Sequence, residues 1–291
     1  MKKYELLKED TITVNGKTLY RIKALVAIGL SVLPGDLGGY VEKKENLSMS
    51  GNAWVYGDAQ VYGDAQVYGD ARVYGDARVY GDAQVYGDAR VYGDAWVCGN
   101  AWVYGNARVY GDARVYSNAR VYGNAQVYSN ARVYGNAQVY SNARVYSNAW
   151  VCGNAWVYGN ARVYGDARVC GNAWVCGNAW VCGNARVYGN AWVCGNAWVC
   201  GDVRVCGNAR VISNREIISV SNVGTENGTL TVTSGKNGLV VTRGCFTGTV
   251  KEFLTKSKKY HDDKTHQEYK LLIEFAKLRI EKHTVDDEAA G

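Results

Sequence analysis

From residue 51 to residue 212 the chain repeats one six-residue pattern of inward-type and outward-type positions. The unit is [Gly/Ser]-[Asn/Asp]-Ala-[Arg/Trp/Gln]-Val-[Tyr/Cys], and it runs 27 times without an insertion, the last copy ending in Ile212. Ala and Val lie two positions apart, which is the period of a strand, and the Gly-Asn or Gly-Asp pair is a turn signal. Each unit therefore predicts one short strand and one corner. Ala and Val point inside, and the Arg/Trp/Gln and Tyr/Cys positions point outside.

A single unit cannot fold alone. Burying its one Val contributes roughly 1.5–3 kcal/mol, whereas ordering the backbone costs roughly 1–2 kcal/mol for each residue. The units must therefore gain their stability by stacking in register, as in other repeat proteins.

The corner of the unit has two candidate positions for the left-handed backbone conformation. Position two is Asn in 17 units and Asp in 10, whereas position one accepts Ser at Ser117, Ser129, Ser141 and Ser147. Asn and Asp tolerate a positive φ better than other non-glycine residues. This pattern favours position two for the left-handed residue.

The run Val-x-Gly-Asn-Ala-x resembles the hexapeptide repeat of left-handed parallel β-helices, in which three hexads form one triangular 18-residue coil. The resemblance implies an all-β chain with about nine coils from the 27 hexads. It alone supplies the left hand, because the general crossover rule favours a right hand. We expect this β-helix at residues 45–218, between an N-terminal β cap at 1–44 and a C-terminal β-to-helix cap or oligomerisation segment at 219–291.

With three hexads in a coil, every third hexad stacks and the outward residues form three columns. One column holds Trp102, Trp156, Trp174 and Trp192, and another holds Arg168, Arg186 and Arg204. These are our candidate binding residues, because Trp, Tyr and Arg dominate the hot spots of protein interfaces. The alternative is that duplication copied a Trp-Val-Cys variant, since six of the nine Trp are followed two residues later by Cys.

Both ends carry local structure signals. Asn15-Gly16 between two β-rich runs predicts a hairpin. Thr249 with Glu252 and Thr265 with Glu268 each fit a helix capping box. The second helix has an apolar face that we expect to pack on the end of the β-helix or on a sister chain, and it consists of Tyr269, Leu272, Ile273, Ala276 and Ile280.

The ends also resemble those of phage and prophage hexapeptide-repeat proteins, which are often labelled polymer-forming or acetyltransferase-like. The matching runs are Leu19-Tyr20-Arg21-Ile22-Lys23-Ala24-Leu25, Gly35-Asp36-Leu37-Gly38-Gly39-Tyr40-Val41-Glu42 and Val241-Thr242-Arg243-Gly244-Cys245-Phe246-Thr247-Gly248-Thr249. The resemblance implies a phage-type protein that acts in the host cytoplasm but carries no established reaction.

Charge is unevenly distributed along the repeat. Residues 51–98 contain seven Asp and three Arg, whereas residues 99–212 contain ten Arg and three Asp. Arg beside Tyr and Trp is typical of single-stranded nucleic-acid grooves and of cation–π stacking. The repeat has no Lys, however, and the formal net charge of the whole chain is only +6, so nucleic acid is disfavoured as a partner and the Arg residues alternatively serve solubility.

No apolar run reaches the roughly 18 residues of a membrane-spanning helix, and the first residues lack the apolar stretch of a signal peptide. We therefore expect a cytoplasmic protein with no membrane partner. Eight of the nine Cys replace Tyr at one repeat position, so we expect reduced thiols rather than a disulfide framework. Three pairs still fall one coil apart, near enough to bridge if oxidised: Cys152 with Cys170, Cys176 with Cys194 and Cys182 with Cys200.

Catalysis is disfavoured by the absence of His from the repeat. The acyltransferases and carbonic anhydrases that resemble this chain need a His base or several His ligands, and a base must lie within hydrogen-bond reach of its proton. The three histidines lie in the tail, at His261, His266 and His283. We interpret Asp262, Asp263 and His266 as a solvated loop rather than a metal cluster, and we expect no cofactor and no metal.

These observations predict a non-enzymatic β-solenoid that presents columns of Arg, Tyr and Trp to a host protein, with inhibition of a host defence protein as the sharper hypothesis. The alternative is a self-assembling structural rod whose C-terminal helices join copies of the chain. An acyltransferase-like enzyme is the third and least favoured class.

Overall fold

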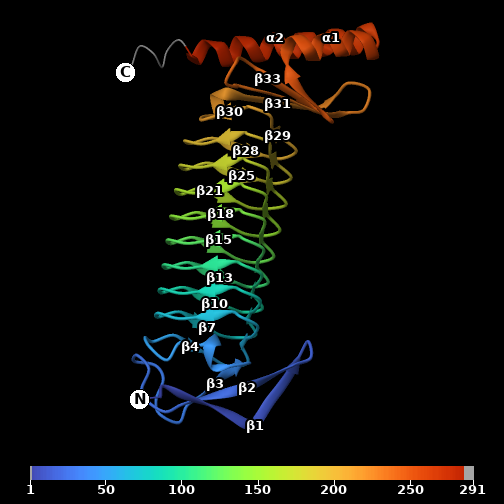
Figure 1. The fold of residues 1–291 in the computed structure, drawn as a ribbon. Helices are drawn as coiled ribbons and strands as arrows, with labels where there is room; N and C mark the ends of the chain where they lie inside the picture. Colours follow the sequence, from blue (N-terminus) through green and yellow to red (C-terminus); the bar gives the residue numbers. More distant parts are fainter. Residues whose placement is uncertain (1, 285–291) are drawn as a thin grey trace. The chain divides into compact units, whose positions relative to one another are not determined.

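The computed structural model describes residues 2–284 and divides the chain into two compact units, residues 1–153 (unit 1) and residues 154–291 (unit 2). All 27 hexads form short strands, β4 to β30, that are shared among three parallel sheets. The fold is the expected triangular β-solenoid, of about ten turns, with an antiparallel N-terminal cap and a C-terminal sheet with two helices. Figure 1 shows the repeat strands stacked turn upon turn within each unit.

Unit 1 starts with an antiparallel cap. Strands β1 and β2 pair around the predicted turn, where Asn15 and Gly16 have φ values of 51° and 76°. Strand β3 is antiparallel to β2 and also parallel to the repeat strand β5, so it joins the cap to the first sheet. The cap consists of β1 (Tyr4–Val14), β2 (Lys17–Ala24), β3 (Leu37–Val41) and the 3-10 helix η1 (Lys44–Asn46).

We call the three sides of the solenoid the first, second and third face. In unit 1 the first face holds β4 (Trp54–Val55), β7 (Arg72–Val73), β10 (Arg90–Tyr92), β13 (Arg108–Tyr110), β16 (Gln126–Val127) and β19 (Arg144–Val145). The second holds β5 (Gln60–Val61), β8 (Arg78–Val79), β11 (Trp96–Val97), β14 (Arg114–Val115), β17 (Arg132–Val133) and β20 (Trp150–Val151). The third holds β6 (Gln66–Val67), β9 (Gln84–Val85), β12 (Trp102–Val103), β15 (Arg120–Val121) and β18 (Gln138–Val139).

Unit 2 has three faces built in the same way, and we give them the same names. Its first face holds β22 (Arg162–Val163), β25 (Trp180–Cys182) and β28 (Trp198–Cys200). Its second holds β23 (Arg168–Val169), β26 (Arg186–Val187) and β29 (Arg204–Val205). Its third holds β21 (Trp156–Val157), β24 (Trp174–Val175), β27 (Trp192–Val193) and β30 (Arg210–Val211).

The interior follows from the two small positions of the unit. Every Ala and Val of the repeat is buried, including Val203 at its alanine place. Paired residues lie 18 positions apart, as Val91 with Val109 and Trp174 with Trp192 show. The predicted inside, outside and columns are therefore confirmed.

The prediction for the corner is wrong. Position one is left-handed in the repeat, including Ser117, Ser129, Ser141 and Ser147 with φ between 56° and 60°, and no Asn or Asp of the repeat has a positive φ. A Cβ at Gly81 would lie 3.0 Å from the backbone nitrogen of Gly99 one turn later, so this position also favours a residue without a side chain. Position two instead forms ladders, in which for example Asn160 Nδ2 donates to Asn178 Oδ1 at 3.0 Å.

A four-stranded antiparallel sheet and two helices end the chain. The elements are the 3-10 helix η2 (Asn214–Glu216), β31 (Ile217–Val223), β32 (Gly228–Thr233), β33 (Val240–Arg243), β34 (Phe246–Thr249), α1 (Val250–Tyr260) and α2 (Asp263–Thr284). The Thr249–Glu252 capping box is present at the start of α1. The second predicted box is wrong, because Asp262 Oδ1 accepts from the backbone of Thr265 at 2.7 Å and Glu268 accepts from Gly224.

The predicted apolar face of α2 is present, but its buried residues pack on the chain's own C-terminal sheet and not, as we expected, on the end of the β-helix. Tyr269, Ile273, Ala276 and Ile280 share one buried cluster with sheet residues such as Val232 and Val241. This contact places α2 on the sheet of the C-terminal cap, and it leaves the opposite side of the helix exposed.

Candidate binding surface

The third face of unit 2 brings three of the predicted tryptophans together. Trp156 and Trp174 are parallel with ring centroids 5.1 Å apart, and Trp174 and Trp192 are parallel at 4.8 Å. The rings stack because parallel strands keep identical positions in register. Trp192 keeps 37% of its surface exposed, and the Arg210 guanidinium lies 4.8 Å from its ring centroid.

A second tryptophan stack lies on the first face of unit 2. Trp180 and Trp198 stack at 4.9 Å, and Arg162 lies 4.8 Å over the Trp180 ring. Trp198 is 55% exposed, more than any other Trp of the described residues. The sequence reasoning missed it, although Trp198 occupies the last hexad of its column and so has no repeat residue one turn later to cover it.

Disulfides connect the same turns that carry these stacks. Cys176 is bonded to Cys194 and Cys182 to Cys200, each with Cα atoms 4.5 Å apart. The expectation of reduced thiols is therefore wrong at these four residues, because in-register stacking brings equivalent Cys within bonding distance. Each bond follows its Trp by two residues, so it fixes the spacing of two adjacent Trp-bearing strands.

The predicted arginines lie on another face. Arg168, Arg186 and Arg204 are aligned on the second face of unit 2, whereas the tryptophan stack is on the third. Arg204 Nη1 donates to the Gly244 carbonyl oxygen, so the C-terminal cap holds this side chain. The two predicted groups are hence separate surfaces rather than one site.

Trp102 lies in unit 1 and has no tryptophan on the turns next to it. Its strand pairs with those of Gln84 and Arg120, and the Arg120 guanidinium lies 4.7 Å over its ring. Trp54 is a structural residue, because it is 1% exposed and packs edge to face with Tyr4. Tryptophans of unit 1 are therefore covered by arginine or buried by the cap.

Tyrosine ladders occupy the corners beside these columns. On the first face Tyr74, Tyr92, Tyr110, Tyr128 and Tyr146 stack in sequence at 4.8–4.9 Å. Burial within a ladder, reinforced by neighbouring phenols, raises the pKa of Tyr122 to about 12. Such tyrosines stay neutral at physiological pH and form a continuous stack of parallel rings.

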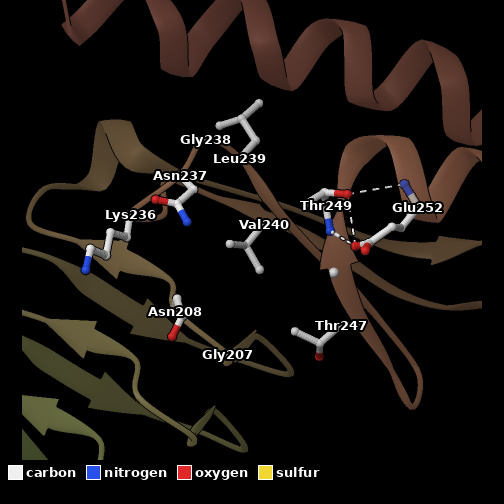
Figure 2. A pocket seen from close by; sticks show the side chains of 11 residues that line it. Gly207, Asn208, Lys236, Asn237, Gly238, Leu239, Val240, Thr247, Thr249 and Glu252 are labelled. Atoms are coloured by element: carbon white, nitrogen blue, oxygen red, sulfur yellow. Dashed lines mark hydrogen bonds between the residues drawn. The ribbon is translucent and has the colours of Figure 1, made fainter.

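The hollow in Figure 2 lies between the last hexad and the C-terminal cap. It has a volume of about 250 Å³ and is bounded by Asn208, the Lys236–Val240 loop, Thr247 and the start of α1. Its carboxylate, Glu252, accepts from the Thr249 backbone and hydroxyl, and these hydrogen bonds lower the pKa of Glu252. The Glu252 carboxylate therefore caps α1 in its ionised form, and its lowered pKa makes it a weak proton acceptor.

The tail histidines have ordinary structural contacts. His266 Nδ1 lies 3.1 Å from the buried Ser257 hydroxyl, and His261 packs against the edge of Tyr269 at 5.6 Å. The side chain of His283 lies outside the described residues. No group of three or more His, Cys, Asp or Glu able to hold a metal occurs in the described part of the chain.

Over residues 2–284 no helix combines the length and apolar character needed to cross a bilayer.

The repeat matches a known β-solenoid family. Matches to the YdcK β-solenoid repeat cover residues 65–81, 83–99, 101–117, 113–129, 125–141, 137–153, 155–171, 161–177, 167–183, 179–195 and 185–201. A comparison with curated proteins found no match.

Proposed function

We propose that the chain, whose repeat matches the YdcK β-solenoid repeat, is a non-enzymatic binding scaffold that holds a protein partner on the stacked tryptophans of unit 2. One observation carries this proposal: Trp174 and Trp192 stack at 4.8 Å on adjacent turns that the Cys176–Cys194 bond joins, and Trp192 is still exposed. Rings held in place before binding lose little conformational entropy in the complex. Large aromatic side chains beside Arg are typical of interface hot spots.

The partner in this proposal is a host protein of a phage-type chain, and binding inhibits it or sequesters it in the host cytoplasm. The resemblance of both ends to phage and prophage repeat proteins supports this choice. The arginines of the two Trp stacks support a protein over a nucleic acid, because Arg162 and Arg210 lie over tryptophan rings. We expect the partner to offer an apolar surface flanked by carboxylates.

The test uses the tagged full-length protein as bait in host lysate, followed by mass spectrometry. The variant W174A/W192A removes two adjacent rings of the stack. The matched control W96A/W150A removes two rings of unit 1 that Arg114 and Arg132 cover at 4.6 Å and 5.2 Å. Loss of a hot-spot residue costs at least about 2 kcal/mol, or roughly 30-fold in affinity.

We expect one stoichiometric host protein with the wild type and the control, and its loss with W174A/W192A. Thermal unfolding of both variants verifies that they are folded. Equal recovery by both variants would place binding elsewhere on the chain, and recovery of the bait alone would refute the scaffold function.

A second function, self-assembly, is favoured by the exposed side of α2. Leu271, Phe275 and Leu278 lie at positions i, i+4 and i+7, and each is more than half exposed. Exposed Glu274 and Arg279 flank this strip five residues apart, which matches the ion-pair spacing across two parallel helices, so the occupant is α2 of a second copy.

Sedimentation velocity tests self-assembly over a wide range of concentration. The wild type is expected to form dimers or larger assemblies, and L271Q/F275Q/L278Q is expected to remain monomeric. The single change E274R weakens assembly and the swap E274R/R279E restores it. A strictly monomeric wild type at high concentration would exclude this function.

A further inference from the structure

An apolar loop closed by backbone hydrogen bonds lies at the start of unit 1. Residues 25–36 connect β2 to β3, and the tip is closed by the Ile28 N–H donating to the Val32 carbonyl at 2.9 Å. Ile28 and Val32 are buried, whereas Leu30 between them is fully exposed and Leu33 is mostly exposed. Leu30 and Leu33 together place two exposed apolar side chains at the tip of one loop, and adjacent exposed apolar residues of this kind are typical of a contact surface.

The loop tip borders a hollow on the first face. The hollow has a volume of about 380 Å³ and is lined by Ser31, Tyr56, Arg72, Tyr74 and Arg90. Gly29 of the loop donates to Asn52 Oδ1 at 3.1 Å, which fixes the tip against the first hexad. The hollow therefore has a defined wall rather than being a continuation of the flat face.

The two arginines of the hollow are directly opposite each other on neighbouring strands. Like charges in this arrangement repel each other. Within the described residues neither Arg72 nor Arg90 forms a side-chain ion pair, hydrogen bond or cation–π contact, whereas Arg114 and Arg120 lie over tryptophan rings. The pair is thus suited to receive an anion from outside.

The tyrosine ladder is interrupted at the same place. Tyr74 and Tyr92 are parallel at 4.9 Å, but Tyr56 and Tyr74 are perpendicular at 6.1 Å and 89°. Tyr74 therefore has a parallel ring on one side and an edge-to-face ring on the other. Both Tyr56 and Tyr74 line the hollow, so an aromatic side chain bound there would contact these rings.

We propose that this hollow binds a short acidic segment of a partner protein, with one or two carboxylates on Arg72 and Arg90, an aromatic side chain on Tyr74, and an apolar residue against Leu30. A polyanion such as nucleic acid is disfavoured, because Arg72 and Arg90 are the two cations that line the hollow and a run of phosphates needs more of them. The exposed leucine of the loop tip suits a protein surface rather than a phosphate backbone. The site lies in unit 1 and does not depend on the tryptophan surface of unit 2.

The experiment selects a surface-displayed library of random 12-residue peptides against the full-length protein. Selected peptides are then measured by fluorescence anisotropy with the wild type, R72Q/R90Q, L30S and the matched control R114Q/R132Q, a pair on the second face. The oligonucleotide dT12 is measured in parallel. Circular dichroism verifies the fold of each variant, which surface substitutions of this kind leave intact.

We expect selected peptides to combine Asp or Glu with Tyr, Phe or Trp. Their affinity is expected to fall about tenfold or more with R72Q/R90Q, as for the loss of charge-assisted hydrogen bonds, and to fall with L30S, but to stay unchanged with R114Q/R132Q. The absence of selected peptides, peptides that bind R72Q/R90Q equally well, or tight Arg-dependent binding of dT12 would each overturn the proposal. W174A/W192A leaves this binding unchanged, so failure here is distinguishable from failure of the proposed function.

Discussion

The tyrosine ladder of the first face should stabilise the turns that it connects, and Tyr110 is the residue at which to test this. Its ring lies between those of Tyr92 and Tyr128, 4.8 Å from each and parallel within 2°. Aromatic pairs contribute roughly 0.5–1.5 kcal/mol beyond their buried area, so two pairs amount to about 2 kcal/mol. Tyr110→Leu keeps apolar bulk at the position but removes both pairs.

The matched control is Tyr56→Leu, because Tyr56 has only one perpendicular ring neighbour at 6.1 Å. We expect it to lose about 0.5 kcal/mol or less. Tyr110→Phe keeps the stack and gives up only a long contact of 3.5 Å from its hydroxyl to Gln126, so it should behave like the wild type.

Native-state hydrogen exchange is the appropriate assay, because solenoid turns open locally and a global two-state analysis fails for long repeats. The free energy of opening should fall by about 2 kcal/mol for amides of β10, β13 and β16 in Tyr110→Leu, with no change in unit 2. Equal losses for Tyr110→Leu and Tyr56→Leu would show that the stacking geometry contributes nothing beyond burial.

Three more predictions follow from the corners, the disulfides and the phenols. Changing the four left-handed serines to Gly should raise the free energy of local opening, measured by hydrogen exchange, by about 0.5 kcal/mol for each site after the added chain entropy is subtracted. Gly at the neighbouring position-two Asn should lower this free energy. The four sites are Ser117, Ser129, Ser141 and Ser147. Reduction with dithiothreitol should destabilise unit 2 by about 2–4 kcal/mol for each disulfide broken, and C176S/C194S should have the same effect for its one bond. The control C98S, at a free cysteine, should leave the transition in differential scanning calorimetry unchanged. An unchanged transition after reduction would contradict the bonded state. Since burial raises the pKa of Tyr122 to about 12, the folded state holds its proton more tightly than the unfolded state above pH 10. The contribution of Tyr122 to the free energy of unfolding is therefore fully present below pH 10 and decreases as the pH rises towards 12. Melting temperatures between pH 9 and 12, with phenolate absorbance at 295 nm, should show this loss. A flat profile would contradict it.

The sequence predicts the structure best inside the repeat, where the same contacts recur on every turn. The six-residue period predicts the buried Ala and Val, and the resemblance to triangular β-helices adds the 18-residue register and hence the columns that hold Trp156, Trp174 and Trp192. It does not predict that position one of the corner is left-handed. That outcome depends on the close approach of Gly81 to Gly99 on the next turn, a contact between residues far apart in the sequence.

In the candidate sites, too, the sequence predicts what the repeat sets but not what its ends and the loop set. The sequence places Trp174 and Cys176 in columns, but the exposure of Trp198 and the hydrogen bond from Arg204 to Gly244 depend on how the repeat ends. The hollow beside Arg72 requires the loop at Leu30 to lie against the first hexads, and this loop has no counterpart in the repeat. No periodic signal connects these segments, so sequence reasoning could not bring them together.

For this protein the sequence by itself determines a stack of short strands and corners, because each unit encodes its own strand, its own corner and the same contact with the next turn, and the resemblance of the repeat adds the triangular turn of three units. Only the tertiary structure decides what happens where that symmetry stops: which face of α2 is buried, which cysteines bond, and which Trp and Arg side chains stay open to a partner. The physical reason is that stacking energy inside the repeat is a sum of identical neighbour contacts, whereas the two caps and the 25–36 loop meet it through contacts that occur once each.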